Sequence, residues 1–493
     1  MCLSGLRGWS CFVSLRRDEV SCVDTFCTSN DVLIAVADYF HLTKRFGIVG
    51  ASQLPFHYLL ALKSPYNPLR YLTGRTHESL NALHQLLGRV VTILIYVHAA
   101  LYLNLYVLKG LLGSKLREPY IIAGVFGVLA LTAVGTTALG FIRRWRYRVF
   151  YTVHVVLATA LLPVLWFHVS HIRVYLYETA AVYVLNAILR NLSSRTVSAS
   201  ITLLDGGSLI NISISKSTDQ HFLRRWQPGQ HAYLSLPGHP VSRTLRSNPF
   251  SVASVPSADG ELRFVARILD GNTAKLAQAA KSEQRHNLTI EGPYGRANHA
   301  DDLLRYDRVL FVAGGVGGTF VAPLYRQLLA DLSPSCGSAR RRKVEFVWIA
   351  RDEGDLRWAV PADEKERVGF LERMSVWVTG RGDGLGEDRG SRLSADQRAH
   401  DEMEDGIELE ERKGLLGNES TYDRSDSNGD LSVKSGRPDL QRIVDRTFMH
   451  DDLEKVAVVV CGPKGLTRTL RTSVEKWVSR GRHVWLWEES FAF

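Results

Sequence analysis

Long apolar runs dominate the chain from about residue 46 to residue 190, whereas short alternating segments with many charges follow from residue 196 onward. Four of these runs have the length that a helix needs to cross about 30 Å of hydrocarbon at about 1.5 Å per residue. They cover residues 90–108, 120–142, 149–169 and 174–189. The pattern therefore predicts a multi-pass membrane domain followed by a soluble half.

The N-terminal end of the apolar region follows this pattern less clearly. A weaker fifth span covers residues 46–62 and contains a proline and His57. The apolar stretch before it, residues 32–40, is too short to cross a membrane. We therefore expect a transmembrane domain over residues 45–192, preceded by a segment of residues 1–44 in which a first span is damaged or missing.

The soluble half divides into two predicted domains. Strand-like segments separated by turn residues predict a small antiparallel β-barrel over residues 196–298. A buried-strand pattern at residues 308–313 then runs into a glycine-rich turn and a helical stretch, which is typical of an α/β domain, here residues 305–493. Residues 379–435 are polar and nearly lack aromatic side chains, so we expect a disordered insertion before the α/β pattern resumes at Val456.

The net charge of +10 at pH 7 would point to a nucleic-acid partner if the basic residues were clustered on a soluble domain. Instead, much of the excess flanks the apolar runs, as in the arginines between residues 143 and 148. This distribution follows the enrichment of Lys and Arg on the cytoplasmic side of membrane proteins. It predicts a lipid bilayer and no nucleic acid as partners, with everything after residue 190 in the cytoplasm. The six cysteines form no CxxC pair, so neither a disulfide framework nor a zinc site is expected.

Four histidines stand at matched spacing on two of the predicted spans. They are His84 and His98 on one span, and His154 and His168 on the next span but one. Within each pair the residues are 14 positions apart, which is close to four helical turns, so both lie on one helix face with a rise of about 21 Å. Because a single span separates the two helices, they cross the membrane in the same direction. The first members of the two pairs therefore lie at the same depth.

Facing helices of a helical bundle are a known place for haem, and neutral imidazole is a good iron ligand. We therefore predict one haem near the cytoplasm, held by His84 and His154. A second haem would lie near the outer face, held by His98 and His168. Polar residues satisfied by helix contacts alone would not account for two identical spacings at matching depths.

Three further histidines lack a partner at matching spacing. We interpret His57 and His77 as polar contacts or loop residues. His171 lies at the outer end of its span, where it would touch the outer haem or the substrate, or would serve as another polar contact.

Residue types suited to a flavin occur in order along the predicted barrel. Residues 248–251 (NPFS) end a strand-like segment, and Arg267 and residues 271–273 (GNT) follow. A flavin needs a flat apolar slot, a hydroxyl group beside its N5 atom, and cationic or backbone donors for its pyrophosphate. The NPFS motif alone is a weak signal. Together with GNT and residues 291–295 (EGPYG), it predicts an FAD site.

A second set of residues suits a nicotinamide nucleotide. Residues 314–319 (GGVGGT) join a strand to a helix, where glycines permit close backbone approach and the helix N-terminus offers donors to a pyrophosphate. Alone, such a turn is equally structural, but residues 461–463 (CGP) follow another strand and form a second loop that can reach the nicotinamide. Arg351, after a further strand, would pair with the 2′-phosphate of NADPH or would be a solvated surface residue.

Taken together, these segments resemble the fungal ferric and cupric reductases, a family that also includes the NADPH oxidases. The resemblance covers residues 45–493. The matching stretches are SPYNPLRYLTG, LHQLLGRVVTILIYVH, RRWRYRVFYTVHVVLATALLPVLWFH, SNPFSVAS, RILDGNT, VAGGVGGTFVAPLY, VVCGPKGL and the terminal EESFAF. It implies an all-α transmembrane haem-binding bundle, then an antiparallel β-barrel FAD-binding domain and an α/β NADP-binding domain.

The resemblance also implies a function, in which NADPH passes a hydride to FAD, and single electrons then reach the inner haem b, the outer haem b and ferric ion outside. By motif match it assigns to the flavin site Pro249, Phe250 and Ser251, with Arg267, Gly271 and Thr273 near the pyrophosphate. It assigns to the NADPH site Gly314, Gly315, Gly317, Thr319, Cys461, Gly462 and Pro463. Asn248 stands where many relatives have His or Arg. The terminus ends in SFAF instead of tryptophan, so Phe493 or Phe491 is the candidate for stacking near the flavin ring.

The choice between related functions depends on what meets the outer haem. The family's superoxide-producing oxidases usually have a second histidine pair one residue closer than the first, whereas both spacings here are 14 residues. This equality favours a metalloreductase. The resemblance implies that it acts on ferric or cupric ions or their chelates and supports iron uptake at the plasma membrane. The alternative functions are those of a superoxide-generating NADPH oxidase and of a non-catalytic regulatory relative. The alternative location is an internal membrane. The intact motifs argue against the non-catalytic alternative.

Overall fold

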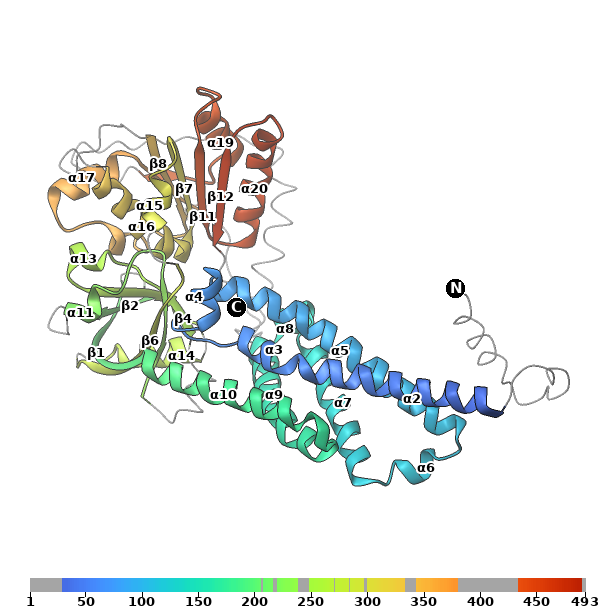
Figure 1. The fold of residues 1–493 in the computed structure, drawn as a ribbon. Helices are drawn as coiled ribbons and strands as arrows, with labels where there is room; N and C mark the ends of the chain where they lie inside the picture. The colour runs from blue at the N-terminus through green and yellow to red at the C-terminus, as the bar shows by residue number, and fades with distance from the viewer. Residues whose placement is uncertain are drawn as a thin grey trace, which may run out of the picture. The chain divides into compact units, whose positions relative to one another are not determined.

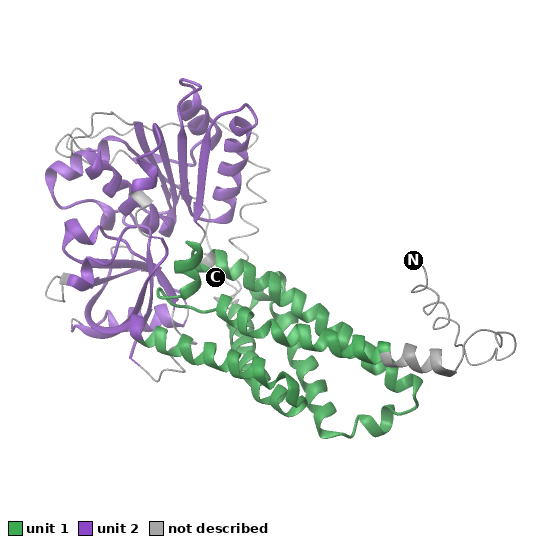
Figure 2. Ribbon diagram, in the orientation of Figure 1, with its two compact units in different colours: residues 1–191 green, residues 192–493 purple. Residues whose placement is uncertain are grey.

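The computed structural model describes residues 29–204, 207–215, 220–237, 248–269, 271–282, 284–296, 299–332, 343–379 and 433–489. The chain divides into two compact units, Met1–Asn191 and Leu192–Phe493 (Figure 2). Most of the expected insertion, the two candidate terminal phenylalanines Phe491 and Phe493, and the first 28 residues lie outside the described residues.

The first unit is helical (Figure 1). Its longer helices are α2 (Ser29–Ser52), α5 (His77–Leu108), α7 (Pro119–Thr137), α9 (Tyr147–His168) and α10 (Arg173–Ser193). Shorter helices connect them, namely α3 (Leu54–Leu60), α4 (Pro68–Thr73), α6 (Leu112–Lys115), α8 (Gly140–Trp145) and the 3-10 turn η1 (Ser170–Ile172). Local sequence sets the helix ends, as at α4, where the Asn67 side chain accepts a hydrogen bond from the Leu69 N–H and Gly74 adopts a left-handed φ of 65°.

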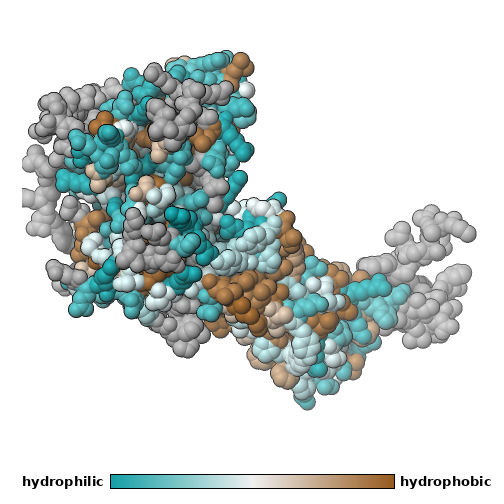
Figure 3. All heavy atoms as spheres, turned by 60° about the vertical axis from the view of Figure 1, so that its left-hand side comes forward, coloured by the Kyte–Doolittle hydropathy of each residue, from teal (hydrophilic) through white to brown (hydrophobic). Residues whose placement is uncertain are grey.

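Within the described part of the chain, four helices are long and apolar enough to cross a membrane. They are Ser79–Leu108, Pro119–Thr137, Tyr147–His168 and Ser170–Ser193. These helices confirm the four clear spans of the sequence pattern. Their exposed faces carry large hydrophobic side chains, and hydrophobic residues gather on the surface of this unit (Figure 3). Such a surface is expected where lipid replaces water as the solvent.

The weaker predicted span, residues 46–62, is not one helix. α2 begins at Ser29 and ends at Ser52, and α3 follows after Gln53. α2 packs along α5, and the hydroxyl group of Tyr39 donates to the carbonyl oxygen of Leu101 over 3.1 Å. The expected boundary near residue 44 therefore falls inside a helix. Polar residues around it interrupt the apolar run in the sequence, but packing against α5 keeps the backbone helical.

The second unit begins with an antiparallel barrel. Its strands are β1 (Ser194–Leu203), β2 (Leu209–Ile214), β3 (His231–Ser235), β4 (Asn248–Ser251), β5 (Leu262–Arg267) and β6 (His286–Tyr294). Among the described residues they are ordered β4-β3-β6-β1-β2-β5. A bridge between Val252 and Phe264 joins the two ends of this order, so the barrel is nearly closed. Alternate side chains of the strands fill its core, as the period of two residues requires. Helices α11 (Gln220–Leu223), α13 (Pro256–Asp259) and α14 (Asn272–Ala279) lie in its connections.

A parallel sheet follows the barrel. Its strands are β7 (Arg308–Gly314), β8 (Lys343–Ala350), β9 (Met374–Val378), β10 (Val433–Ser435), β11 (Val456–Cys461) and β12 (Val484–Glu489), in the order β10-β9-β8-β7-β11-β12 as far as the structure describes the chain. Helices α15 (His299–Leu303), α16 (Gly318–Asp331), α17 (Glu364–Glu372), α19 (Leu440–Phe448) and α20 (Lys464–Val478) accompany it. The order reverses between β7 and β11. Ligands of open parallel sheets bind at such a reversal, beyond the carboxyl ends of the strands.

The barrel and the parallel sheet share a hydrophobic core. Leu209 and Val265 of the barrel pack in one cluster with Phe311 of β7. Arg326 of α16 also pairs with Asp259 of α13 over 2.8 Å, a contact that joins the two domains across their boundary. The barrel and the α/β domain therefore form one unit.

Candidate functional site

The matched histidines come together in pairs inside the helical unit. The ring centroids of His84 and His154 lie 6.1 Å apart, and those of His98 and His168 lie 6.5 Å apart. Two imidazoles that share one metal ion through bonds of about 2 Å, with each ring centre about 1 Å behind its nitrogen, have centroids about 6 Å apart. Both pairs therefore have the spacing that bis-histidine ligation of a haem iron requires.

Backbone carbonyl groups orient three of these rings. The Nδ1 atoms of His84, His98 and His168 lie 3.0, 2.8 and 2.7 Å from the carbonyl oxygens of His57, Thr43 and Tyr120, respectively. A ring that donates its Nδ1–H to a carbonyl keeps a lone pair on Nε2, which is the usual arrangement of a metal-binding histidine. The Nδ1 of His154 is buried and has no hydrogen-bond partner among the described residues. His154 is thus the ring of the four that backbone hydrogen bonding orients least.

We refer to His84 and His154 as the inner pair and to His98 and His168 as the outer pair. Glycines leave room for the rings of the outer pair. A Cβ atom at Gly47 would lie 2.6 Å from Cε1 of His98, and one at Gly124 would lie 2.6 Å from Cε1 of His168. Any side chain at either position would push an imidazole aside. The sequence pattern singles out neither glycine, because small residues in membrane helices commonly serve helix packing alone.

No group of three or more His, Cys, Asp or Glu side chains in the described ranges is placed to hold a metal ion. A haem needs at most two axial ligands from the protein, since the porphyrin supplies the others. The two histidine pairs are therefore the ligand sets to consider. His77 is the first residue of α5, and His171 is exposed in η1.

Two of the motifs expected at the flavin, NPFS and GNT, lie next to each other on the barrel. In the pairing of β3 with β4, Leu234 stands opposite Asn248, the first residue of the NPFS motif. The side-chain Nδ2 of Asn272, at the start of α14, donates a hydrogen bond of 3.2 Å to the carbonyl oxygen of Leu234. This bond brings residues 271–273 next to β4, so two motifs that are separate in the sequence become neighbours.

The side chains of these motifs differ in what they offer to a ligand. Phe250 is buried in the barrel core, whereas Pro249 and Ser251 are half-buried, and Arg267 at the end of β5 is exposed. Gly271 has a φ of 80°, which favours glycine, and it directly precedes α14. The buried Thr273 hydroxyl lies 2.9 Å from both the amide nitrogen and the carbonyl oxygen of Leu269. Thr273 therefore stabilises the turn before α14.

The two predicted nucleotide loops meet at the reversal of the parallel sheet. Ala313 of β7 stands opposite Cys461 of β11, so the loops that follow them begin side by side. A Cβ atom at Gly317 would lie 2.2 Å from the carbonyl oxygen of Cys461, and one at Gly462 would lie 3.0 Å from Cα of Gly314. A Cβ atom at Gly314 would likewise lie 2.7 Å from Cδ of Pro463. The loops thus approach so closely that only glycine fits.

Three other candidate residues surround these loops. Thr319 is buried, and its hydroxyl donates to the carbonyl oxygen of Val316 over 2.8 Å, so it stabilises the glycine-rich turn, in which Gly315 has a φ of 52°. Cys461 is fully buried, and burial together with the negative charge of Glu489 raises the pKa of its thiol well above the usual value. Arg351 is exposed and directly follows β8, the strand beside β7.

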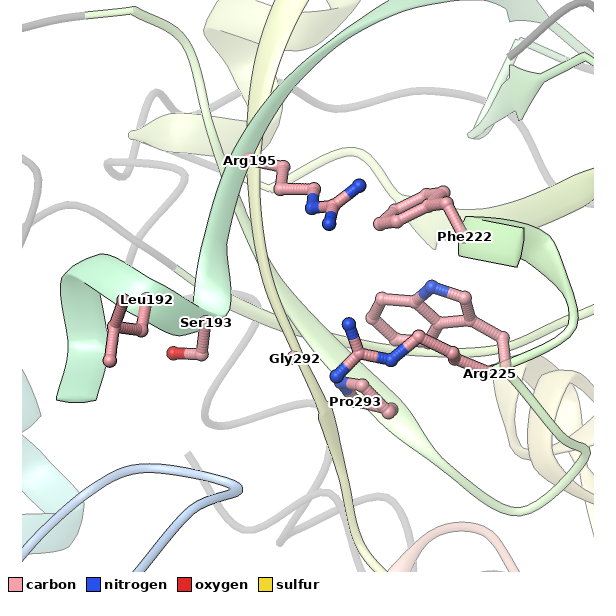
Figure 4. A pocket seen from close by; sticks show the side chains of 8 residues that line it. Leu192, Ser193, Arg195, Phe222, Arg225, Gly292 and Pro293 are labelled. Carbon is pink, nitrogen blue, oxygen red and sulfur yellow. The ribbon is translucent and has the colours of Figure 1, made fainter. Parts of the chain in front are cut away.

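A small pocket lies elsewhere on the barrel (Figure 4). Its lining consists of Leu192, Ser193, Arg195, Phe222, Arg225, Trp226, Gly292 and Pro293. The guanidinium group of Arg195 lies 5.8 Å from the ring centroid of Phe222, and the buried indole Nε1 of Trp226 has no hydrogen-bond partner among the described residues. Apart from Gly292 and Pro293 of the EGPYG motif, this lining contains none of the residues expected at the cofactors.

Comparison with protein families finds three matches along the chain. Residues 46–165 match the ferric reductase like transmembrane component, residues 193–298 match an FAD-binding domain, and residues 306–475 match the ferric reductase NAD binding domain. The predicted fold class is thereby confirmed: a helical transmembrane region, an FAD-binding barrel and an NAD-binding α/β part.

Three curated relatives illustrate the similarity to fungal proteins. The chain is 24% identical to the probable metalloreductase AIM14 of Meyerozyma guilliermondii, over 86% of this chain and 79% of that protein. It is 27% identical to ferric/cupric reductase transmembrane component 2 of Saccharomyces cerevisiae, over 64% of this chain and 44% of that protein. It is 26% identical to the probable cell surface ferric reductase kap2 of Aspergillus oryzae, over 64% and 44%. This chain is therefore a homologue of the fungal ferric and cupric reductases and carries their transmembrane, FAD-binding and NAD-binding domains.

Proposed function

We propose that this chain is a transmembrane metalloreductase that moves electrons from cytosolic NADPH through FAD and two bis-histidine haems to ferric or cupric ions outside. The observation that carries the proposal is the pairing of four membrane histidines with centroid separations of 6.1 and 6.5 Å. The FAD-binding and NAD-binding domains of the same chain supply the cytoplasmic end of such a path. The proposal includes a role in iron uptake at the plasma membrane. The names of two relatives, a ferric/cupric reductase transmembrane component and a probable cell surface ferric reductase, support the metal ions and the location.

The chemistry divides between the cofactors and the chain. When bound, FAD accepts a hydride and releases single electrons, and haem iron carries electrons one at a time. Gly314, Gly317 and Gly462 keep the nucleotide loops in close approach, so that a pyrophosphate can meet backbone N–H groups at the start of α16. The fully buried Cys461 keeps its proton because its pKa is raised, so no thiolate nucleophile lies at the end of β11.

The proposed function predicts that purified protein with NADPH reduces a ferric chelate faster than it produces superoxide in air. The matched spacing of the histidine pairs favours this outcome over the oxidase alternative. The measurement is ferrous-chelate absorbance beside a superoxide assay on the same preparation. Faster superoxide production would contradict the proposal and favour the oxidase alternative. A purified protein without a haem Soret band would indicate a non-catalytic relative.

Arg351 supplies a prediction about the nucleotide. If its exposed guanidinium at the end of β8 binds the 2′-phosphate, Arg351→Gln should raise the KM for NADPH about tenfold or more and leave the KM for NADH unchanged. A charge-assisted hydrogen bond of about 1.5–3 kcal/mol gives an effect of this size. Steady-state reduction with both nucleotides measures it, and the neighbouring half-buried Glu353 provides a control as Glu353→Gln. Equal changes for NADPH and NADH would assign Arg351 to the surface.

A further inference from the structure

His57 lies against one of the paired histidines. It is part of α3, which begins after the break at Gln53 and has a proline in its first turn. Its ring is stacked on the ring of His84, with centroids 4.0 Å apart and planes inclined by 5°. The sequence pattern indicates a polar contact or loop residue at His57, because this histidine has no partner at matching spacing. The contact exists because α3 packs against α5. The spacing of residues along the sequence does not indicate such packing.

Two reciprocal hydrogen bonds join the same residues. The Nδ1 of His84 lies 3.0 Å from the carbonyl oxygen of His57, and the Nε2 of His57 lies 3.1 Å from the carbonyl oxygen of His84. If each ring nitrogen donates its proton, each histidine binds the backbone of the other. This assignment leaves Nε2 of His84 free to bind a metal. The stacked ring of His57 and the two hydrogen bonds together fix the plane of the His84 ring.

Gly88 confines the ring of His57 further. A Cβ atom at Gly88, one turn after His84 on α5, would lie 3.0 Å from Nε2 of His57. The glycine therefore provides the space in which the His57 ring lies flat. The stack is held by the contact with His84, the two hydrogen bonds and the shape of α5 at this position.

The outer pair lacks this arrangement in the described structure. The Nδ1 of His98 also binds a carbonyl oxygen, that of Thr43, but the ring beside it is Tyr102, whose plane is inclined by 74° at a centroid distance of 4.9 Å. The planes within the inner pair are inclined by 64°, and those within the outer pair by 88°. The two pairs thus have different ring orientations, and a stacked neighbour fixes one of them.

We infer that His57 is a positioning residue for the inner haem, which fixes the plane of the His84 ring and thereby tunes the electronic properties of the iron. The inference rests on the proposed function, since it requires haem at this pair. The angle between axial imidazole planes changes the g-values of low-spin ferric haem. Interactions around the ligands also shift its midpoint potential. His57 acts through His84 and needs no contact with the iron.

The test compares three variants of the full chain by electron paramagnetic resonance and redox titration of the haems. His57→Ala removes the stacked ring and should shift the g-values and the midpoint potential of one haem while the other keeps its wild-type values. His57→Phe restores a flat ring without the donor and should return the signal toward that of wild type. Tyr58→Phe, on the same helix, removes a hydrogen bond of 2.6 Å to the carbonyl oxygen of Ala158 and should change neither haem signal.

The outcomes separate this inference from the proposed function. A wild-type protein without two haems contradicts the proposed function itself. If the His57→Ala protein contains two haems with unchanged signals, the inference about His57 is overturned and the proposed function stands. If His57→Ala loses haem, rescue by His57→Phe supports positioning by the ring, whereas equal loss in both variants assigns His57 a structural role and overturns the inference.

Discussion

Replacement of His84 by alanine should remove about half of the haem from the purified protein and abolish reduction of ferric chelates. The variant deletes one ligand of the inner pair, whose rings lie 6.1 Å apart, and leaves the outer pair intact. The two pairs are separated along their helices by about 21 Å, so loss of one haem need not release the other. The electron path is then interrupted between the flavin and the outer haem. Pyridine haemochrome content and the reductase rate measure the two effects.

His77→Ala provides the matched control, because His77 begins the same helix and belongs to neither pair. It should keep the full haem content. Full haem content in His84→Ala would mean that another residue holds the inner iron. Loss of all haem would mean that the two sites form together. The combination of half the haem with a retained outer-haem spectrum is specific to two independent bis-histidine sites.

Gly317→Ala should abolish reduction of the flavin by NADPH while chemically added electrons still reduce the haems. The new Cβ atom would lie 2.2 Å from the carbonyl oxygen of Cys461 and 2.6 Å from its carbonyl carbon. Both are backbone atoms of β11, so β7 and β11 or their loops must separate. Overpacking of this kind costs about 1–3 kcal/mol, and here it displaces the loops proposed to bind the nucleotide. Anaerobic stopped-flow absorbance of the flavin measures the reaction.

Gly369→Ala is the control for this substitution. Gly369 lies in α17 and a Cβ atom there would meet nothing within 4 Å, so alanine should be neutral or should stabilise that helix. Normal flavin reduction by Gly317→Ala would show that the closest approach of the two loops is not needed for nucleotide binding. A Gly317→Ala protein that also loses FAD would instead indicate collapse of the whole second unit.

The histidine pairs could be predicted from the sequence because their geometry is local. A helix fixes which residues share a face, and a spacing of 14 residues determines both face and depth without knowledge of any other helix. The same holds for the clear spans, whose length alone identifies them. The glycine-rich turn and the CGP segment were also readable, since each directly follows a strand pattern.

The remaining features depend on contacts between segments that are distant in the sequence. Gly47 and Gly124 matter because each faces a histidine on another helix. His57 matters because a break at Gln53 starts a new helix that brings its ring onto His84. Helix α2 runs through the expected boundary near residue 44 because it packs on α5. No local pattern encodes such contacts, so the sequence predicted which histidines pair better than it predicted what surrounds them.

The shared core of the barrel and the parallel sheet has a consequence for how this protein changes over evolutionary time. Leu209 and Val265 pack with Phe311, and the backbone carbonyl of Trp358 accepts a hydrogen bond of 3.0 Å from Arg263 of the barrel. A substitution on one side of this boundary alters the packing of the other. The flavin and nucleotide halves should therefore be inherited and exchanged between relatives as one piece, residues 192–493, and not as two interchangeable modules.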